Sequence, residues 1–230
     1  MPAGAFSVQV LRIIDVHLRP SPPENPPMSQ ITEAADLRQA YAEPGELAQK
    51  KLMQRLDAHA RRFIGLSPFL TIASSSATGT DCSPRGDQPG FVHVVDDQTL
   101  LIPDRRGNNL LDTLQNVLAK PDVGLLFFVP GLNETLRVNG RATIVTDPAI
   151  LKSMAIRETI MPTSAMRVAI DQVYFHCGRS LLRADIWNPD KKLARTDFPL
   201  LGTIIADQVK GVDAEKANAN LEVAYTTNLY

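Results

Sequence analysis

The first segment that could do chemistry is residues 104–109, which carry five polar side chains: Asp104, Arg105, Arg106, Asn108 and Asn109. The segment stands between a strand-like run and a helical pattern, so the N–H groups of the first helical turn are unpaired and point toward it. A phosphate there would meet the positive end of the helix dipole, two guanidinium groups and two side-chain amides. A solvated turn, with the arginines paired to Asp104 or Asp112, explains the same pattern equally well.

The second candidate is residues 82–87 (CSPRGD), which we expect to form a loop. Pro84 stiffens this loop, and Gly86 lets the backbone approach a ligand closely. Arg85 could then neutralise the electron-rich edge of a ring or a second anionic group. The alternative is a surface turn in which Arg85 and Asp87 pair with each other, an interaction worth less than about 1 kcal/mol.

Two weaker candidates lie on later strand-like runs. Thr135 and Arg137 alternate with apolar residues, so both side chains share one face of a strand. From that face Arg137 could reach a cofactor or pair with Glu134. His176 could donate a proton and Cys177 could act as a redox thiol, although a structural role suits each of them better. The chain lacks the sequence motifs of serine hydrolases, zinc proteases and nucleoside triphosphatases.

The composition indicates an ordinary globular chain. It has 230 residues, a formal net charge of −1 and 44% hydrophobic residues, so nothing suggests non-specific binding to nucleic acid. The two cysteines do not have zinc-binding spacing, and no metal site is expected. No apolar run approaches the roughly 20 residues that span a bilayer. We therefore expect a cytoplasmic protein with no membrane partner.

The order of elements predicts four regions. Residues 1–27 are proline-rich at their end and form an N-terminal arm or extension; residues 28–68 are helical, with a long helix at 46–64. Residues 69–187 hold the strand-like runs, with a helix at 110–118, a bulge at Gly140 and Asp147 as a helix N-cap. Residues 188–230 form a helical tail packed on the same domain. The strand-like runs are residues 69–74, 91–95, 99–103, 123–129, 134–144 and 168–175.

These strands are short and closely spaced, which leaves no room for helical crossovers between parallel strands. The sequence therefore predicts a mainly β, α+β fold: an antiparallel split β-barrel with flanking helices.

From about residue 47 to residue 187 the chain resembles the pyridoxamine 5'-phosphate oxidase-like family of FMN-binding split barrels. The resemblance is to a bacterial branch with the motifs SPRGD, LLIPDRxGN, GLLFxVPG, ETLRVNGRA and FHC. These motifs occur here at residues 83–87, 100–108, 124–131, 134–142 and 175–177.

In such proteins FMN lies at the interface of a homodimer. The resemblance implies that Arg105, Arg106, Asn108 and Asn109 form the phosphate-binding turn, with Asp104 at its start. It also implies further cofactor contacts: Ser83, Pro84 and Arg85 beside the isoalloxazine ring, Thr135 and Arg137 at its polar edge, and Arg179, Ser180 and Trp187 from the second subunit. No catalytic residue is assigned.

Two departures bear on the activity. The phosphate turn of the true oxidase has a serine–arginine–lysine run, where this chain has Gly107, Asn108 and Asn109. The C-terminal motif that holds pyridoxamine phosphate is not recognisable in residues 186–230. The resemblance thus implies an FMN-dependent oxidoreductase acting on a small organic substrate rather than a vitamin B6 oxidase. The alternative is a non-catalytic dimer that binds a flavin, a deazaflavin or haem, with His59, His93 or His176 available as a haem ligand.

Overall fold

The computed structural model describes residues 30–230, so the predicted arm at residues 1–27 lies outside the described residues. The described chain forms two units, and the first ends at Pro44 and contains the helix α1 (Ala34–Ala40). The second unit, Gly45–Tyr230, contains every other element and all of the predicted site residues.

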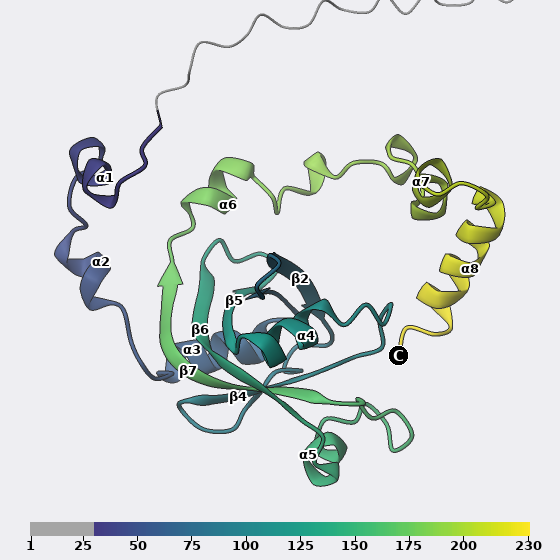
Figure 1. The fold of residues 1–230 in the computed structure, drawn as a ribbon, viewed down its shortest axis with the longest axis horizontal. Coiled ribbons are helices and arrows are strands. Elements are labelled where there is room, and N and C mark those ends of the chain that lie inside the picture. The colour runs from purple at the N-terminus through teal and green to yellow at the C-terminus, as the bar shows by residue number, and fades with distance from the viewer. Residues whose placement is uncertain (1–29) are drawn as a thin grey trace, which may run out of the picture. The chain divides into compact units, whose positions relative to one another are not determined.

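A seven-stranded antiparallel sheet forms the centre of the second unit, with strand order β2-β1-β5-β6-β7-β4-β3 (Figure 1). The edge strands β2 and β3 each pair with one neighbour but not with each other in the described chain. The sheet therefore does not close into a barrel. The predicted antiparallel split barrel is confirmed. The strands are β1 (Phe69–Ser75), β2 (Thr80–Gly86), β3 (His93–Val94), β4 (Thr99–Pro103), β5 (Asp122–Phe128), β6 (Thr135–Val145) and β7 (Ala165–His176).

Alternation of side chains along the strands builds the core. On β1, Leu70 and Ile72 are fully buried, and their register partners on β5 are Phe127 and Leu125. Because successive side chains of a strand point to opposite faces, the residues between them lie on the outer face of the sheet. Burial of each such side chain contributes about 2 kcal/mol, so the inner face sets the register of the central strands.

The predicted loop at residues 82–87 is wrong: residues 82–86 belong to the edge strand β2, which pairs along its whole length with β1. Pro84 misled the prediction because it cannot donate to a ladder. An edge strand tolerates proline, since one of its sides has no partner strand.

The single long helix predicted at residues 46–64 is also wrong. Two helices, α2 (Glu46–Lys50) and α3 (Ala58–Leu66), are separated by a segment in which Met53 pairs with Val173 of β7. Asp57 then caps α3 by accepting a hydrogen bond from the N–H of Ala60. A local helical pattern thus yields to a long-range backbone pairing.

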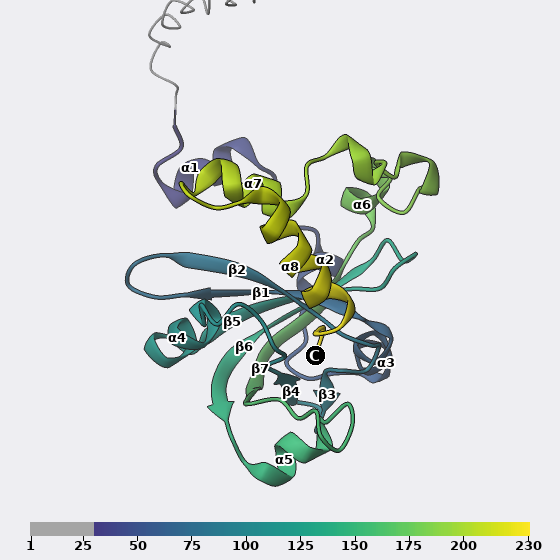
Figure 2. The same ribbon diagram turned by 90° about the vertical axis from the view of Figure 1, so that its right-hand side faces the viewer.

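Three other local predictions are confirmed. The β6–β7 register shifts between Asn139 and Gly140, and a Cβ at Gly140 would collide with the carbonyl oxygen of Ala169. Helix α4 (Asp112–Ala119) covers most of the helix expected at residues 110–118. Asp147 caps α5 (Pro148–Ser153) through the N–H groups of Ala149 and Ile150. In Figure 2, α4 lies to the left and α3 to the right of the curved sheet, and both helices pack side chains into the same core.

The C-terminal part contains short helices, as predicted. They are α6 (Arg179–Ala184), η1 (Pro189–Lys191), η2 (Arg195–Asp197), α7 (Leu201–Gln208) and α8 (Ala214–Thr226). Helices α7 and α8 pack on each other at the buried Gly202, where the side chain of Asn218 lies close to the glycine. No helix in residues 30–230 combines the length and apolar character needed to cross a membrane.

Candidate functional site

A cavity of about 620 Å³ opens beside the end of β2, the turn after β4 and the start of α4. Eight of the thirteen predicted cofactor-binding residues line this cavity, which we call the anion pocket: Ser83, Pro84, Arg85, Asp104, Arg105, Arg106, Asn108 and Asn109. Residues 107, 110–114, 159–163 and 230 complete its wall. The two basic segments identified in the sequence therefore meet at one place.

Arg105 is held by its own chain. Its Nε donates to Oδ2 of Asp87 at 2.7 Å, and its Nη1 donates to the carbonyl oxygen of Met154 at 2.9 Å. This pairing replaces the one with Asp104 or Asp112 that the sequence suggested. It brings together the turn after β4, the residue that follows β2 and the end of α5.

Arg85 and Asp104 form the second charged pair of the pocket. Nη2 of Arg85 lies 3.9 Å from Oδ1 of Asp104, and the Nε of Arg85 is buried with no hydrogen-bond partner in the described chain. The predicted Arg85–Asp87 turn pair is not formed. Burial raises the pKa of Asp104, while the positive charge of Arg85 opposes this rise. The Nε of Arg85 is thus a buried donor without a partner among the described residues.

The turn before α4 is exposed and strained. Arg106 has no ion pair or hydrogen bond with any described residue. Asn109 and Leu111 have φ angles of 60° and 62°, a left-handed conformation that is unfavourable for leucine. Leu111 is the N-cap of α4 and offers no side-chain acceptor, so N–H groups of the first turn remain unsatisfied by a cap. Strain of this kind is typical of ligand-binding turns.

Sequence reasoning missed two parts of the pocket wall and the residue that holds Arg105. Asp87 was considered only as a partner of Arg85, whereas its carboxylate holds Arg105. The loop at residues 159–163 forms one wall, and Tyr230 lines the cavity while donating to Oδ1 of Asp87 at 2.9 Å. Tyr230 lies 143 positions from Asp87, and no local pattern indicates such a contact.

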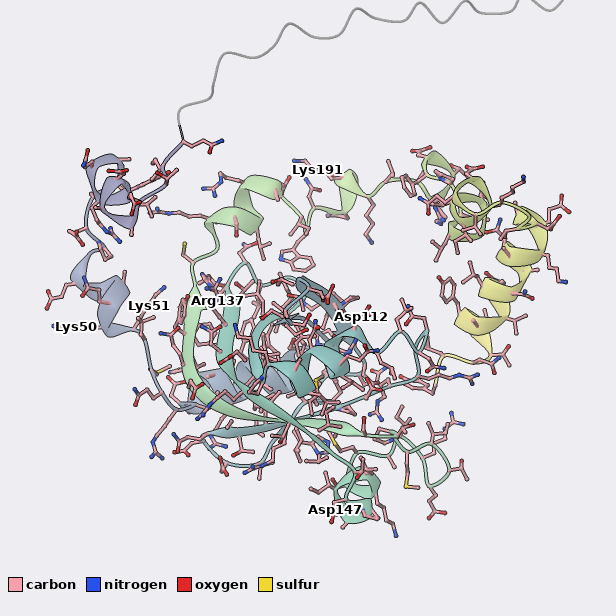
Figure 3. The ribbon with its side chains drawn as sticks, viewed as in Figure 1. Lys50, Lys51, Asp112, Arg137, Asp147 and Lys191 are labelled. Atoms are coloured by element: carbon pink, nitrogen blue, oxygen red, sulfur yellow. The ribbon has the colours of Figure 1, made fainter. Side chains whose placement is uncertain are left out.

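Thr135 and Arg137 do not line the anion pocket. Nη1 of Arg137 donates to the hydroxyl of Tyr174 at 3.0 Å, and Thr135 is buried opposite His176 in the β6–β7 ladder. In Figure 3, Arg137 lies near Lys51 and well apart from Asp112 at the start of α4. We call residues Lys51, Arg137, Tyr174 and His176 the β7-end cluster.

The last three predicted residues, Arg179, Ser180 and Trp187, also lie outside the pocket. Arg179 and Ser180 begin α6, and the indole N–H of Trp187 donates to the carbonyl of Leu132 at 2.9 Å. The backbone N–H of Arg179 and then its charge lower the pKa of the exposed Cys177 thiol. Within one chain, these residues are therefore not part of the pocket.

The donor set of the pocket suits a phosphate monoester. Three guanidinium groups and two asparagine amides surround the cavity, and one of the guanidinium nitrogens is buried without a partner in the described chain. Guanidinium groups match the geometry of phosphate oxygens and form charge-assisted hydrogen bonds with them. The residues present thus fit the phosphate end of a flavin mononucleotide.

The open antiparallel sheet with its flanking helices has the architecture of a split barrel. The family model described as pyridoxamine 5'-phosphate oxidase matches residues 56–177, which is more than half of the chain. The chain belongs to the pyridoxamine 5'-phosphate oxidase family. The comparison with curated proteins gives no match.

Several solved structures are similar to this chain. HupZ of Group A Streptococcus has 15% identity and a TM-score of 0.42 over 51% of this chain and 91% of its own. A candidate pyridoxamine 5'-phosphate oxidase of Lactobacillus delbrueckii has 17% identity and a TM-score of 0.42 over 53% and 95%. General stress protein 26 of Bacillus anthracis has 15% identity and a TM-score of 0.37 over 50% and 88%. At these values the similarities carry no information on ligand or activity.

Proposed function

We propose that this protein is an FMN-dependent oxidoreductase that works as a homodimer. The observation that carries the proposal is the anion pocket, where Arg85, Arg105 and Arg106 from two separate segments converge beside the start of α4. The phosphate of FMN carries nearly two negative charges near neutral pH, and guanidinium groups bind such an anion through charge-assisted hydrogen bonds. Bound FMN would supply the redox chemistry, exchanging a hydride with a small organic substrate.

The sheet connects the pocket to the β7-end cluster. Pro84, Thr71, Leu126, Arg137 and Tyr174 are successive register partners across β2, β1, β5, β6 and β7, so they lie on one face. Side chains of this face are the outward ones, opposite to the core. A ring held along this face would have Arg137 at its polar edge, where a positive charge stabilises developing negative charge. Arg85 is the register partner of the fully buried Leu70, so its side chain lies on the other face of the sheet.

The homodimer is proposed for the remaining residues. Arg179, Ser180 and Trp187 lie outside the pocket of their own chain, and the family resemblance assigns them to the cofactor site of a second subunit. In a homodimer, a cofactor site shared by two subunits would include these three residues. Cross-linked or native-mass dimers that lose FMN on dissociation would support this arrangement, and a monomer that binds FMN fully would contradict it.

The test of the cofactor is a titration of apoprotein with FMN, riboflavin and a deazaflavin. Riboflavin lacks the phosphate, so the proposal expects FMN to bind at least tenfold more tightly, which corresponds to about 1.4 kcal/mol. Equal binding of FMN and riboflavin would overturn the phosphate assignment. Reduction of bound FMN by a nicotinamide or another donor, followed by reoxidation with candidate substrates, then tests catalysis.

The second candidate is a dimer that binds a flavin, a deazaflavin or haem without catalysis. The observation that favours it is His176, whose Nε2 is buried and has no hydrogen-bond partner in the described chain. Burial, and then the charges of Arg137 and Lys51, lower the pKa of His176, which keeps the ring neutral and able to ligate iron. A Soret absorption band after haem addition that disappears in His176→Ala would support this candidate.

A further inference from the structure

Asp87 presents a carboxylate that is almost completely buried at the edge of the anion pocket. Its side chain is 3% exposed and accepts three hydrogen bonds. Oδ2 accepts from Nε of Arg105 at 2.7 Å, and Oδ1 accepts from the N–H of Gln88 at 2.7 Å and the hydroxyl of Tyr230 at 2.9 Å. A buried charge is tolerated only with such partners, so this carboxylate has a fixed position.

The fixed carboxylate also fixes Arg105. With Nε held by Asp87 and Nη1 held by the carbonyl of Met154, the plane of the guanidinium group is defined at two of its three nitrogens. Nη2 has no partner in the described chain, and the side chain, 18% exposed, lines the cavity. Arg106 beside it is exposed and has no such support. The two adjacent arginines thus carry the same charge but differ in how firmly they are held.

We propose that Asp87 is a positioning residue for anion binding: it holds Arg105 in the orientation in which the guanidinium group donates hydrogen bonds to a phosphate. The inference rests on the proposed function, since it concerns how Arg105 is held in the pocket proposed to bind the phosphate of FMN. A preoriented guanidinium group loses less conformational entropy on binding than a free side chain, and this difference appears as affinity. Tyr230, which donates to the other oxygen of Asp87, helps to hold the carboxylate.

Simple electrostatics predicts the opposite effect of removing this charge. A negative carboxylate near an anion site repels the anion, so its neutralisation should strengthen binding. If positioning dominates, neutralisation weakens binding. Whether FMN affinity rises or falls on neutralisation of Asp87 therefore separates the two explanations, whatever the size of the change.

The experiment compares Asp87→Asn with Asp112→Asn, using FMN and riboflavin as probes in a fluorescence titration. Asp112 is an exposed carboxylate of the same pocket with no ion pair or hydrogen bond to Arg105 in the described chain, so its neutralisation changes the charge without releasing Arg105. We expect Asp87→Asn to bind FMN at least fivefold more weakly, with riboflavin binding changed less than twofold. Asp112→Asn should bind FMN more tightly than the wild type, because it removes a negative charge from the pocket and leaves the hydrogen bonds of Arg105 in place.

Two further variants guard against a general loss of structure. Asp87→Glu keeps the charge and displaces it by one methylene, so positioning predicts weaker FMN binding and electrostatics predicts no change. In an Arg105→Gln background, Asp87→Asn should have no further effect on FMN binding, because Asp87 acts through Arg105. If Asp87→Asn does not fold, as judged by its melting temperature, Asp87→Glu decides the question.

The failures of the two proposals are distinguishable. If the wild type binds FMN and riboflavin equally, the phosphate site itself is wrong. If the wild type prefers FMN and either Asp87 variant keeps the full preference, the phosphate site stands and the positioning role of Asp87 is overturned.

Discussion

The anion pocket and the β7-end cluster both contain arginine, but the partners of the arginine side chains differ. In the pocket, Arg105 and Arg85 face the carboxylates of Asp87 and Asp104. In the cluster, Arg137 donates to the neutral hydroxyl of Tyr174 and Lys51 donates to the carbonyl of Phe175, and no ion pair involves either basic residue in the described chain.

The difference has a measurable electrostatic consequence. Charges of Arg137 and Lys51 add to burial in lowering the pKa of His176. In the pocket, the internal carboxylates fix the direction of the guanidinium groups and reduce the net positive charge. The pocket is thus organised for a specific geometry, which suits a phosphate, and the cluster for a positive field, which suits a delocalised ring edge.

The largest effect is expected at the pocket. Arg105→Ala together with Arg106→Ala removes two of the three guanidinium groups, so FMN affinity should fall at least tenfold, or about 1.4 kcal/mol. Riboflavin affinity should stay within twofold, because riboflavin carries no phosphate. Titration with both ligands measures the change, and an unchanged melting temperature shows that the barrel is intact. Unchanged FMN affinity would place the phosphate elsewhere.

A smaller and less selective effect is expected at the cluster. Arg137→Ala should weaken FMN and riboflavin alike, by about threefold to tenfold, since a charge at the edge of the ring serves both ligands. Arg141→Ala is a matched control, because Arg141 lies on the same strand, is exposed and pairs with Asp171. A loss confined to FMN in Arg137→Ala would remove the distinction between the two regions.

The smallest effect concerns the thiol next to the cluster. A lowered pKa gives Cys177 more thiolate at a given pH in the folded than in the unfolded chain, so iodoacetamide should modify it faster in the folded state near neutral pH. The advantage should disappear above the ordinary pKa of a thiol, where Cys177 is ionised in both states. Cys82→Ser leaves one thiol to follow by mass spectrometry. Arg179→Gln should reduce the advantage, and an equal rate in urea near neutral pH would contradict the assignment.

Local patterns predicted the frame well. Alternating apolar residues located most of the strands, and Asp147 marked a helix start because an N-cap is a short-range interaction. The family resemblance also led us to expect that residues 83–85 and residues 104–109 lie at one site, because both motifs belong to the cofactor site of that family. These predictions depend on neighbours in sequence or on an inherited order of elements.

The errors share a physical cause, which is partnership over long distances in sequence. Met53 pairs with Val173 and interrupts a helix that local periodicity favours. Arg105 pairs with Asp87 and the carbonyl of Met154 rather than with the nearer Asp104. Tyr230 reaches the pocket from the far end of the described chain. No composition or periodicity encodes such contacts, since they exist only once the sheet has formed.

The most direct test of the account is a crystal structure of the protein with FMN. We expect the phosphate to lie in the anion pocket, within hydrogen-bond distance of Arg105 and Arg106, with the Asp87–Arg105 pair intact. A structure in which FMN binds elsewhere while this pocket holds only solvent would contradict the central claim.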